Sequence, residues 1–401
     1  LEPMEVVHKY TQGFHSVADT FNLRPPSIEP SASGHIIEQI DLVEKIINAG
    51  LAYEINGSVY FDVEKYHETS HYGILSGRVL EDLMAGTREL DGQDEKRSPL
   101  DFALWKKAST VHIMRWPSPW SDGFPGWHLE CSTMSTKYLG KQFDIHGGGL
   151  DLKFPHHECE IAQCMAAYGE SPAKYWMHAN MLTVNGQKMS KSLGNSFLPH
   201  QLFTGDHEIL DRGYSPMTVR FFMLQTHYRS TLDLSNDALT AAAKGYKKLA
   251  NGLRVLKQLK HPDDGSESAE EQVEQQINQL CDNCYHAMND DFNTAKTIAH
   301  LFNLLKKINS IHNGSLAITQ LSSDTFQRMK STFTGFVCEV LGLLEEPLND
   351  VESLLRIVLD NYQQAKSNKE YDKVDQIREQ LKAQGVVVKD MKTGIDWAYE
   401  E

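Results

Sequence analysis

The residue pattern changes sharply near the middle of the chain, and this change constrains the fold more than any other feature. Glycine, histidine and tryptophan cluster over residues 102–194, as they do where loops on a rigid scaffold carry a functional site. After residue 215 helical periodicities take over, first at residues 239–259 and then at 273–311 and 325–344. The sequence therefore predicts a site-bearing part with many loops, followed by a helical part.

Segments outside these two parts add smaller elements. Residues 33–52 carry apolar side chains at three- and four-residue spacing, which predicts a helix, and residues 57–63 read as a short strand. Residues 261–272 are acidic and polar, include a proline and a glycine, and are typical of a linker. A helical run, a glycine and the apolar residues 386–388 then predict a small separate module at the end of the chain.

The composition is that of a soluble protein with two or three cores: 401 residues, 40% hydrophobic and 23% charged. No apolar run is long enough to span a bilayer, and the first residues lack the features of a signal peptide. Six cysteines are too few for a disulfide framework, which indicates the reducing cytoplasm. The net charge of −15 argues mildly against a nucleic-acid partner, although it does not describe local patches.

Cys131, His156 and Glu160 form the first candidate site. His156 and Glu160 are four residues apart in a segment where Pro155 suits the first turn of a helix, so their side chains share one face. An imidazole and a carboxylate placed in this way can hold one cation, and a thiolate from Cys131 completes a three-ligand set. Sulfur, nitrogen and oxygen donors together suit one tetrahedral zinc per chain, with an exchangeable fourth position for a substrate.

A simpler interpretation competes with this one, because a histidine and a glutamate four residues apart on a helix are usually only a surface pair. His157, Glu158 and Cys159 are also competing ligands in the same segment. Cys281 and Cys284 form a CxxC pair without a second pair nearby, and we interpret them as ordinary residues of the helical part. Spacing alone therefore favours the surface pair over zinc.

Residues 188–195, with the sequence KMSKSLGN, form the second candidate site. Lys188 and Lys191 are three residues apart, with small hydroxyl residues beside them and a glycine after them, which predicts a mobile cationic loop. Such a loop can neutralise a triphosphate while negative charge moves onto the leaving pyrophosphate. A solvated basic turn would explain a generic pair of lysines, but the full string favours the phosphate-binding interpretation.

KMSKS is the signature of class I aminoacyl-tRNA synthetases, and longer strings resemble one member of that class, the cysteinyl-tRNA synthetases. The resemblance runs from near residue 10 to the C-terminus. The strings that carry it are DFALWK at 101–106, GWHLECS at 126–132, FDIHGGG at 143–149 with Asp151, FPHHE at 154–158 with Glu160, HYRS at 227–230, DDFNT at 290–294 and the closing residues 385–397. The resemblance implies an α/β fold with a Rossmann-type class I catalytic domain, of which the second half and the insertion are present, then an α-helical bundle and a small α+β module.

The resemblance also implies roles for single residues. In that family two cysteines, one histidine and one glutamate hold a zinc that binds the thiolate of the substrate cysteine, and three of these ligands match Cys131, His156 and Glu160. Lys191 matches the ATP-binding lysine of the loop, with Lys188 assisting. The remaining matches are Trp127, His146 and Asp151 for the cysteine pocket and, by position only, Lys366, Asp375 and Asp390 for the anticodon. A solvated charged helix explains each anticodon match equally well.

The implied activity is ATP-dependent ligation of L-cysteine to tRNA(Cys) through a cysteinyl-adenylate, with Mg-bound ATP as a substrate. Serine differs from cysteine by one atom and apolar contacts discriminate poorly between them, whereas a thiophilic metal binds a thiolate far better than a hydroxyl. We expect a cytoplasmic monomer that has no membrane partner. Two alternatives stay open: a cysteine ligase acting on a small amine such as glucosaminyl-inositol, and a non-catalytic RNA-binding paralogue.

The same resemblance implies a set of domain boundaries. We expect a remnant of the first half of the Rossmann domain at 1–25, a connective insertion at 26–125, the second half with the zinc site at 126–187, the KMSKS loop and stem-contact region at 188–238, a tRNA-binding helical bundle at 239–347 and an anticodon-binding module at 348–401.

One family motif is not found in this sequence. Class I synthetases carry an HxGH-type motif early in the catalytic domain, and the first zinc cysteine of the family lies in that region, but no cysteine precedes Cys131 here. We therefore expect this polypeptide alone to be inactive or strongly impaired, for want of part of the ATP site and one zinc ligand. Robust cysteine-dependent ATP–pyrophosphate exchange by the same polypeptide would contradict that expectation.

Overall fold

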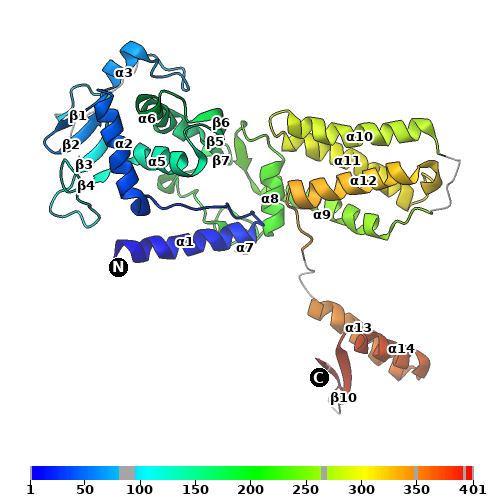
Figure 1. Cartoon of the computed structure of the whole chain (residues 1–401). Helices are drawn as coiled ribbons and strands as arrows, with labels where there is room; N and C mark the ends of the chain where they lie inside the picture. The colour runs from blue at the N-terminus through cyan, green and yellow to red at the C-terminus, as the bar shows by residue number, and fades with distance from the viewer. Residues whose placement is uncertain (1, 81–94, 263–268, 347–350, 392–393, 400–401) are drawn as a thin grey trace. The chain divides into compact units, whose positions relative to one another are not determined.

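A computed structural model of the chain describes residues 2–80, 95–262, 269–346, 351–391 and 394–399 (Figure 1). The chain divides into two units, Leu1–Leu344 and Glu345–Glu401, and each is described by itself. Residues 81–94 of the predicted insertion and 263–268 of the predicted linker lie outside the described residues. Among the described helices, none is both long and apolar enough to cross a membrane.

The first unit begins with helices that differ greatly in burial. Helix α1 (Pro3–Thr20) starts at a proline, whose fixed φ suits a first helical turn, and it buries none of its residues. The predicted helix at 33–52 is confirmed as η1 (Ala32–His35) and α2 (Ile36–Asn48). Helix α2 buries an apolar stripe that includes Leu42, Val43 and Ile46, so it is held by packing rather than by propensity alone.

A four-stranded antiparallel sheet follows, in the order β1-β2-β3-β4. Its strands are β1 (Ala52–Ile55), β2 (Ser58–Phe61), β3 (Phe102–Lys107) and β4 (Gly123–Pro125), and the short helix α3 (Val63–Thr69) follows β2. Asn56 and Gly57, both with positive φ, form the tight turn between β1 and β2. Strand β2 is buried along its whole length, because its side chains share one core with α2, α5 and α6.

The site-bearing part is a parallel βαβ unit. Strands β5 (Phe143–Gly149) and β6 (Ala173–Ala179) pair in parallel. Between them the chain forms the short turns η3 (Leu150–Leu152) and η4 (Lys153–His157) and then helix α6 (Glu158–Tyr168). Helix α5 (Trp127–Leu139) precedes β5 and contacts α6 (Figure 1). Ligands of such folds bind near the carboxyl ends of the parallel strands, so the ends of β5 and β6 are where a site is expected.

A second small sheet leads into the lysine loop. Strand β7 (Leu182–Val184) pairs antiparallel with β8 (Gln187–Lys188) and parallel with β9 (Leu232–Leu234). Between β8 and β9 lie η5 (Lys191–Leu193), α7 (Pro199–Thr204) and α8 (Pro216–Leu224). These parallel pairs and the connecting helices confirm the predicted α/β class.

The helical part is a bundle around one long hydrophobic core. Its helices are α9 (Asn236–Gln258), α10 (Glu271–Asn289), α11 (Thr294–His312) and α12 (Ser323–Thr334), with the short turns η6 (Ile318–Gln320) and η7 (Gly335–Val340). The helical stretch predicted at 273–311 is therefore two helices. It is interrupted because Asn293 accepts a hydrogen bond from the Lys296 amide and so caps a new helix.

The second unit is a small α+β module. It contains α13 (Val351–Ser367), α14 (Tyr371–Lys382) and an antiparallel hairpin of β10 (Val386–Met391) and β11 (Gly394–Tyr399). Tyr362, Val374 and Val388 belong to its core. The strand predicted at 386–388 is confirmed, whereas its partner β11 was not predicted.

Arg220 of α8 joins distant parts of the first unit. Its guanidinium donates hydrogen bonds to the carbonyl oxygens of Phe21 (2.7 Å), Asn22 (3.2 Å) and Leu341 (2.6 Å), and Asn22 donates in turn to the Gly342 carbonyl (3.0 Å). Burial lowers the pKa of Arg220 from its usual range. The chain after α1 and the chain after η7 are thus held on the same side chain.

Replacing Arg220 with methionine should lower the free energy of unfolding by about 2–3 kcal/mol, since carbonyl groups that now bond to a cation lose their donor. Denaturant unfolding measures this change. Arg254→Met is the control, because Arg254 is exposed on α9 and its replacement should change stability by about 0.5 kcal/mol or less. Equal effects of the two substitutions would refute the role given to Arg220.

Candidate metal centre and lysine loop

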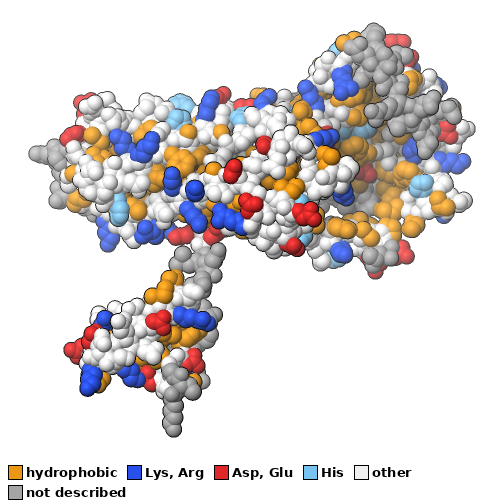
Figure 2. Space-filling model, turned by 180° about the vertical axis from the view of Figure 1, so that it is seen from behind, with side chains coloured by type: hydrophobic (Ala, Val, Ile, Leu, Met, Phe, Trp, Pro, Cys, Tyr) orange, Lys and Arg blue, Asp and Glu red, His pale blue; other side chains and the backbone are white. Residues whose placement is uncertain are grey.

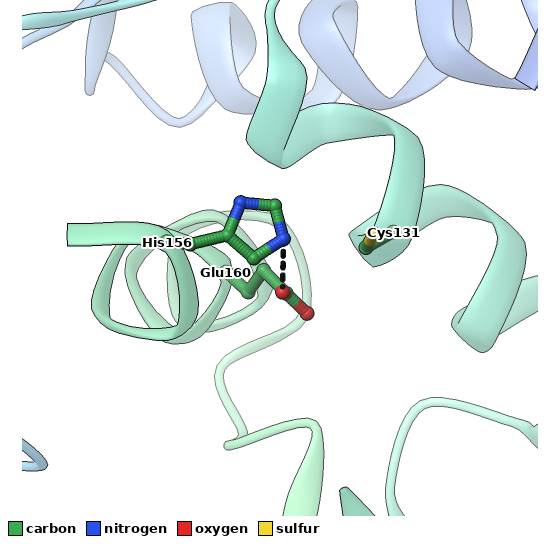
Figure 3. Close-up of side chains that lie close together, drawn as sticks. All are labelled: Cys131, His156 and Glu160. Atoms are coloured by element: carbon green, nitrogen blue, oxygen red, sulfur yellow. Dashed lines mark ion pairs between the residues drawn. The ribbon is translucent and has the colours of Figure 1, made fainter. Parts of the chain in front are cut away.

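Cys131, His156 and Glu160 come together from two facing helices (Figure 3). Cys131 lies on α5, His156 near the end of η4 and Glu160 in the first turn of α6. One ligand atom from each residue lies within 4.8 Å of the others. The sequence spacing had placed His156 and Glu160 on one helical face, and the Nε2 atom of His156 lies 3.0 Å from the Glu160 carboxylate.

The Glu160 carboxylate is the most unusual group of this cluster. Its side chain is 1% exposed, and neither of its oxygens takes part in a hydrogen bond with the described residues. The Nε2 atoms of His156 and His146 lie 3.0 and 3.5 Å from the two oxygens, but not in hydrogen-bonding geometry. Because buried carboxylates are normally hydrogen-bonded or coordinated, this cluster is a candidate cation site.

Further histidines surround these residues. The ligand atoms of His146, His157 and Glu160 form a second group within 4.8 Å of one another. The Nδ1 atom of His128 lies 2.8 Å from Nδ1 of His156, and Nδ1 of His157 lies 2.9 Å from Nε2 of His178. Such contacts fix the ring orientation and tautomer of a histidine, and therefore determine which nitrogen is left for a ligand.

Burial sets the protonation of the cluster. It lowers the pKa of His128 to about 4 and that of His157 to about 3, with smaller contributions from neighbouring histidines, and it also lowers the pKa of His146. Burial, followed by the charges of Glu160 and Glu130, raises the pKa of the Cys131 thiol to about 12. The imidazoles of His128, His146 and His157 are therefore neutral near pH 7, and the thiol loses its proton readily only when a cation compensates the charge.

Two of the three competing ligands of the same segment are directed to other partners, whereas His157 belongs to the second group of ligand atoms. The Glu158 carboxylate accepts hydrogen bonds from the backbone amides of Leu75 and Ser76, and the Cys159 sulfur lies 3.4 Å from the hydroxyl of Tyr72. The sequence could not show these contacts, so it left both residues as competing ligands. Cys281 and Cys284 lie in the hydrophobic core of the bundle.

The residues matched to the cysteine pocket are placed differently from one another. Trp127 is 58% exposed and its ring centroid lies 4.3 Å from that of His156. His146 lies beside the ligand cluster, with its ring 4.7 Å from that of Trp176. Asp151 is exposed in η3, directly after β5, where a Cβ on Gly149 would collide with its carboxylate. Trp127 and His146 therefore border the ligand cluster, and Asp151 lies at the carboxyl end of β5.

The lysine loop is held by Asn195, the last residue of the KMSKSLGN string, to which the sequence analysis gave no role. Asn195 is buried, accepts a hydrogen bond from the Ser190 amide (2.8 Å) and donates one to the Lys188 carbonyl (3.1 Å). The Ser190 hydroxyl caps η5 by accepting from the Leu193 amide. Both Lys188 and Lys191 are exposed, so the loop presents its two cations to solvent while its backbone is clamped.

The residues matched to anticodon contacts share one ion-pair network in the second unit. Lys366 lies 2.9 Å from Asp390, and Arg378 lies 3.1 Å from Asp390 and 3.8 Å from Asp375. Arg378 also donates to the hydroxyl of Tyr362. The pKa of Asp390 is lowered, first by its hydrogen bond with Lys366. Sequence reasoning missed Arg378, although its position one turn after Asp375 was a usable signal.

Two family models and one solved structure identify the class of protein to which the chain belongs. The family described as "tRNA synthetases class I (C) catalytic domain" matches residues 2–244, and the "DALR domain" family matches residues 283–345. The fold is similar to that of the Mycobacterium tuberculosis methionyl-tRNA synthetase bound by methionyl-adenylate, with a TM-score of 0.55, 16% identity, and coverage of 85% of this chain and 77% of that one. The fold and the site-bearing part are thus those of a class I aminoacyl-tRNA synthetase.

More similar sequences narrow the class to one family. The chain is 58% identical to the cysteine–tRNA ligase of Cytophaga hutchinsonii and 51% identical to that of Bacteroides fragilis. Each match covers 99% of this chain and 80% of the relative. The chain belongs to the cysteine–tRNA ligase family.

Replacing Asn195 with alanine should free the lysine loop, because two hydrogen bonds between its ends are lost. We expect hydrogen exchange at the Ser190 amide to accelerate about tenfold, the change that corresponds to roughly 1.4 kcal/mol. Ser192→Ala is the control, since Ser192 is exposed in the same loop and its hydroxyl bonds to the Ser190 hydroxyl rather than to the backbone of the loop. Unchanged exchange in the Asn195 variant would refute the clamp.

Proposed function

We propose that this protein ligates L-cysteine to tRNA(Cys) through a cysteinyl-adenylate, with a zinc ion held by Cys131, His156 and Glu160. The observation that supports this most is the buried Glu160 carboxylate, whose oxygens are approached by imidazole nitrogens and satisfied by no hydrogen bond from the described residues. The thiol, imidazole and carboxylate donors of the cluster form the set that zinc prefers.

The residues around the proposed ligands have defined tasks. His128 fixes the orientation of the His156 ring through the contact between their Nδ1 atoms, which leaves Nε2 directed at Glu160. Trp127 covers the His156 ring and narrows the space beside it, and His146 borders Glu160. When bound, zinc would supply a soft partner for the sulfur of cysteine that the hydroxyl of serine matches poorly.

In this proposal the lysine loop acts on ATP. The cysteine carboxylate attacks the α-phosphorus of Mg-bound ATP, pyrophosphate leaves, and the acyl group then passes to a ribose hydroxyl at the end of the tRNA while AMP leaves. Lys191, assisted by Lys188, stabilises the charge that accumulates on the pyrophosphate. The clamp by Asn195 holds both cations on one short turn, so less order has to be gained when ATP binds.

The charge distribution of the bundle supports RNA as the partner, despite the overall acidity of the chain. Figure 2 shows that Lys and Arg side chains gather locally on the surface of the first unit. Helix α9 carries five basic residues and one acidic one, whereas α10 carries three acidic residues and no lysine or arginine. Lys247, Lys248 and Arg254 are exposed on α9 and form no ion pair with the described residues. This basic face suits an RNA backbone.

Two further parts of the proposal concern domains. The proposed bundle (239–347) binds the body of the tRNA, and the proposed C-terminal module (348–401) reads the anticodon with a surface that includes Lys366, Asp375 and Asp390. The family of the chain and its DALR match favour tRNA over a small amine as the cysteine acceptor. Transfer of labelled cysteine to tRNA, rather than to glucosaminyl-inositol, is the experiment that separates the two acceptors.

The zinc ligands are tested by metal content. We expect the purified chain to hold about one zinc per molecule, and Cys131→Ser to bind zinc at least about tenfold more weakly, because a thiolate ligand is lost. Elemental analysis after dialysis against a weak chelator measures this. Cys338→Ser is the control, since Cys338 lies in the bundle region. Equal zinc content in both variants would exclude Cys131 as a ligand.

The basic face of α9 is tested by the salt dependence of tRNA binding. Replacing Lys247, Lys248 and Arg254 with alanine should reduce the slope of log affinity against log salt by about 2, since each lost phosphate contact contributes roughly 0.7–0.9. The control replaces Lys296, Lys306 and Lys307 of α11, each of which has a side-chain partner in its own bundle. An unchanged slope in the α9 variant would contradict a phosphate-binding role.

A further inference from the structure

Glu158 is a buried acid for which the proposed reaction has no use. It is the first residue of α6, and it is 1% exposed. Its carboxylate accepts hydrogen bonds from the backbone amides of Ser76 (2.9 Å) and Leu75 (3.2 Å). A negative charge in the first turn of a helix is favoured by the helix dipole, and bonds from two successive amides satisfy a buried carboxylate. Glu158 therefore ties α6 to a segment about eighty residues earlier in the chain.

The segment 72–78 contacts both the first turn of α6 and the preceding turn η4. The Tyr72 hydroxyl lies 3.4 Å from the Cys159 sulfur, and the Arg78 guanidinium lies 4.4 Å from the centroid of the Phe154 ring. Gly73 has a φ of +105°, and a Cβ there would collide with the Arg78 carbonyl. The segment is therefore a tight turn that depends on glycine, and its amides are directed at Glu158.

The position of Glu158 on the helix means that its contact with residues 75 and 76 fixes the rotation of α6. Each residue of an α-helix advances by roughly 100°, so residue 158 lies about 160° from both residue 156 and residue 160 when the shorter way round is taken. His156 and Glu160 thus share one face, and Glu158 leaves the opposite face toward residues 75 and 76. An anchor on that face fixes the rotation of the helix about its axis, which sets the direction of both proposed ligands.

We propose that Glu158 is a positioning residue for the metal centre, and that the turn at residues 72–78 is the support against which it holds α6. This inference rests on the proposed zinc site. Metal centres require their ligands within about half an ångström of the productive geometry, and groups that orient the ligands commonly change metal affinity 10- to 100-fold when removed. Glu158 acts through His156 and Glu160, not by touching the metal or the substrate.

The test uses Glu158→Gln in the full chain, with Co²⁺ as a spectroscopic probe of the metal site. The substitution keeps the shape of the side chain but weakens its bonds to the two amides. Its matched control is Glu274→Gln, because the Glu274 carboxylate accepts the backbone amide (2.6 Å) and the hydroxyl (2.7 Å) of Ser322 in the bundle. Co²⁺ affinity and the visible absorption band are measured for both variants, together with their thermal unfolding.

We expect Glu158→Gln to bind Co²⁺ about tenfold more weakly than the wild type and to show a changed visible band, because His156 and Glu160 are no longer held in one orientation. Glu274→Gln should unfold at a lower temperature and keep the wild-type affinity and band. A Glu158 variant that loses thermal stability but binds Co²⁺ as the wild type does would show a merely structural role and overturn the inference.

Two further results separate this inference from the proposed function. If Cys131→Ser binds Co²⁺ as the wild type does, the proposed zinc site is wrong and the inference fails with it. If Glu158→Gln does not fold, Arg78→Met replaces it, since Arg78 is exposed and contacts Phe154 from the same turn. That variant should weaken Co²⁺ binding about threefold, the order expected from losing a cation–π contact, and an unchanged affinity would overturn the inference.

Discussion

The hydrogen bonds of Arg220 are the constraint on which the arrangement of the first unit depends. Its guanidinium binds backbone carbonyls only, at residues 21, 22 and 341, so it fixes the course of the chain rather than the position of another side chain. The same helix packs on α9, and the core around it includes Leu234 of β9 as well as the bundle helices. The lysine loop, which lies between β8 and α8, is therefore built on the same core as the proposed RNA-binding surface.

A second joint connects the bundle to the carboxyl end of β6. Asp291, in the turn between α10 and α11, lies 2.5 Å from Nε of Arg229 and accepts a hydrogen bond from Tyr228. Asn180, directly after β6, bonds to the carbonyls of both of these residues. Asp291 and Phe292 both have positive φ, a conformation that costs a non-glycine residue about 1 kcal/mol or more and persists where the surroundings enforce it. Two consecutive strained residues therefore lie where the bundle meets the end of a parallel strand.

Local sequence patterns predicted the features that depend on the geometry of one helix. They could not predict contacts between residues that are distant in the sequence. The pairing of His156 with Glu160 follows from helical spacing, and so does the helix at 33–52. Helical spacing places Glu158 on the face opposite His156 and Glu160, but it could not show that the amides of residues 75 and 76 bind the Glu158 carboxylate there. In the same way, the resemblance matched Lys366 and Asp390 by position only. In the folded unit these two residues form an ion pair, and Arg378 links Asp390 to Asp375.

The burial of its donor groups affects which metal ion the proposed metal centre prefers. Desolvation favours the neutral forms of the Cys131 thiol and of the surrounding imidazoles, so binding a cation has to offset the loss of the thiol proton. A hard cation such as Mg²⁺ gains little from sulfur and imidazole donors, whereas a thiophilic cation gains enough to displace that proton. Preference for a soft metal therefore follows from the burial of the donors as well as from their identity. In the proposed reaction, discrimination between the sulfur of cysteine and the oxygen of serine depends on that same preference.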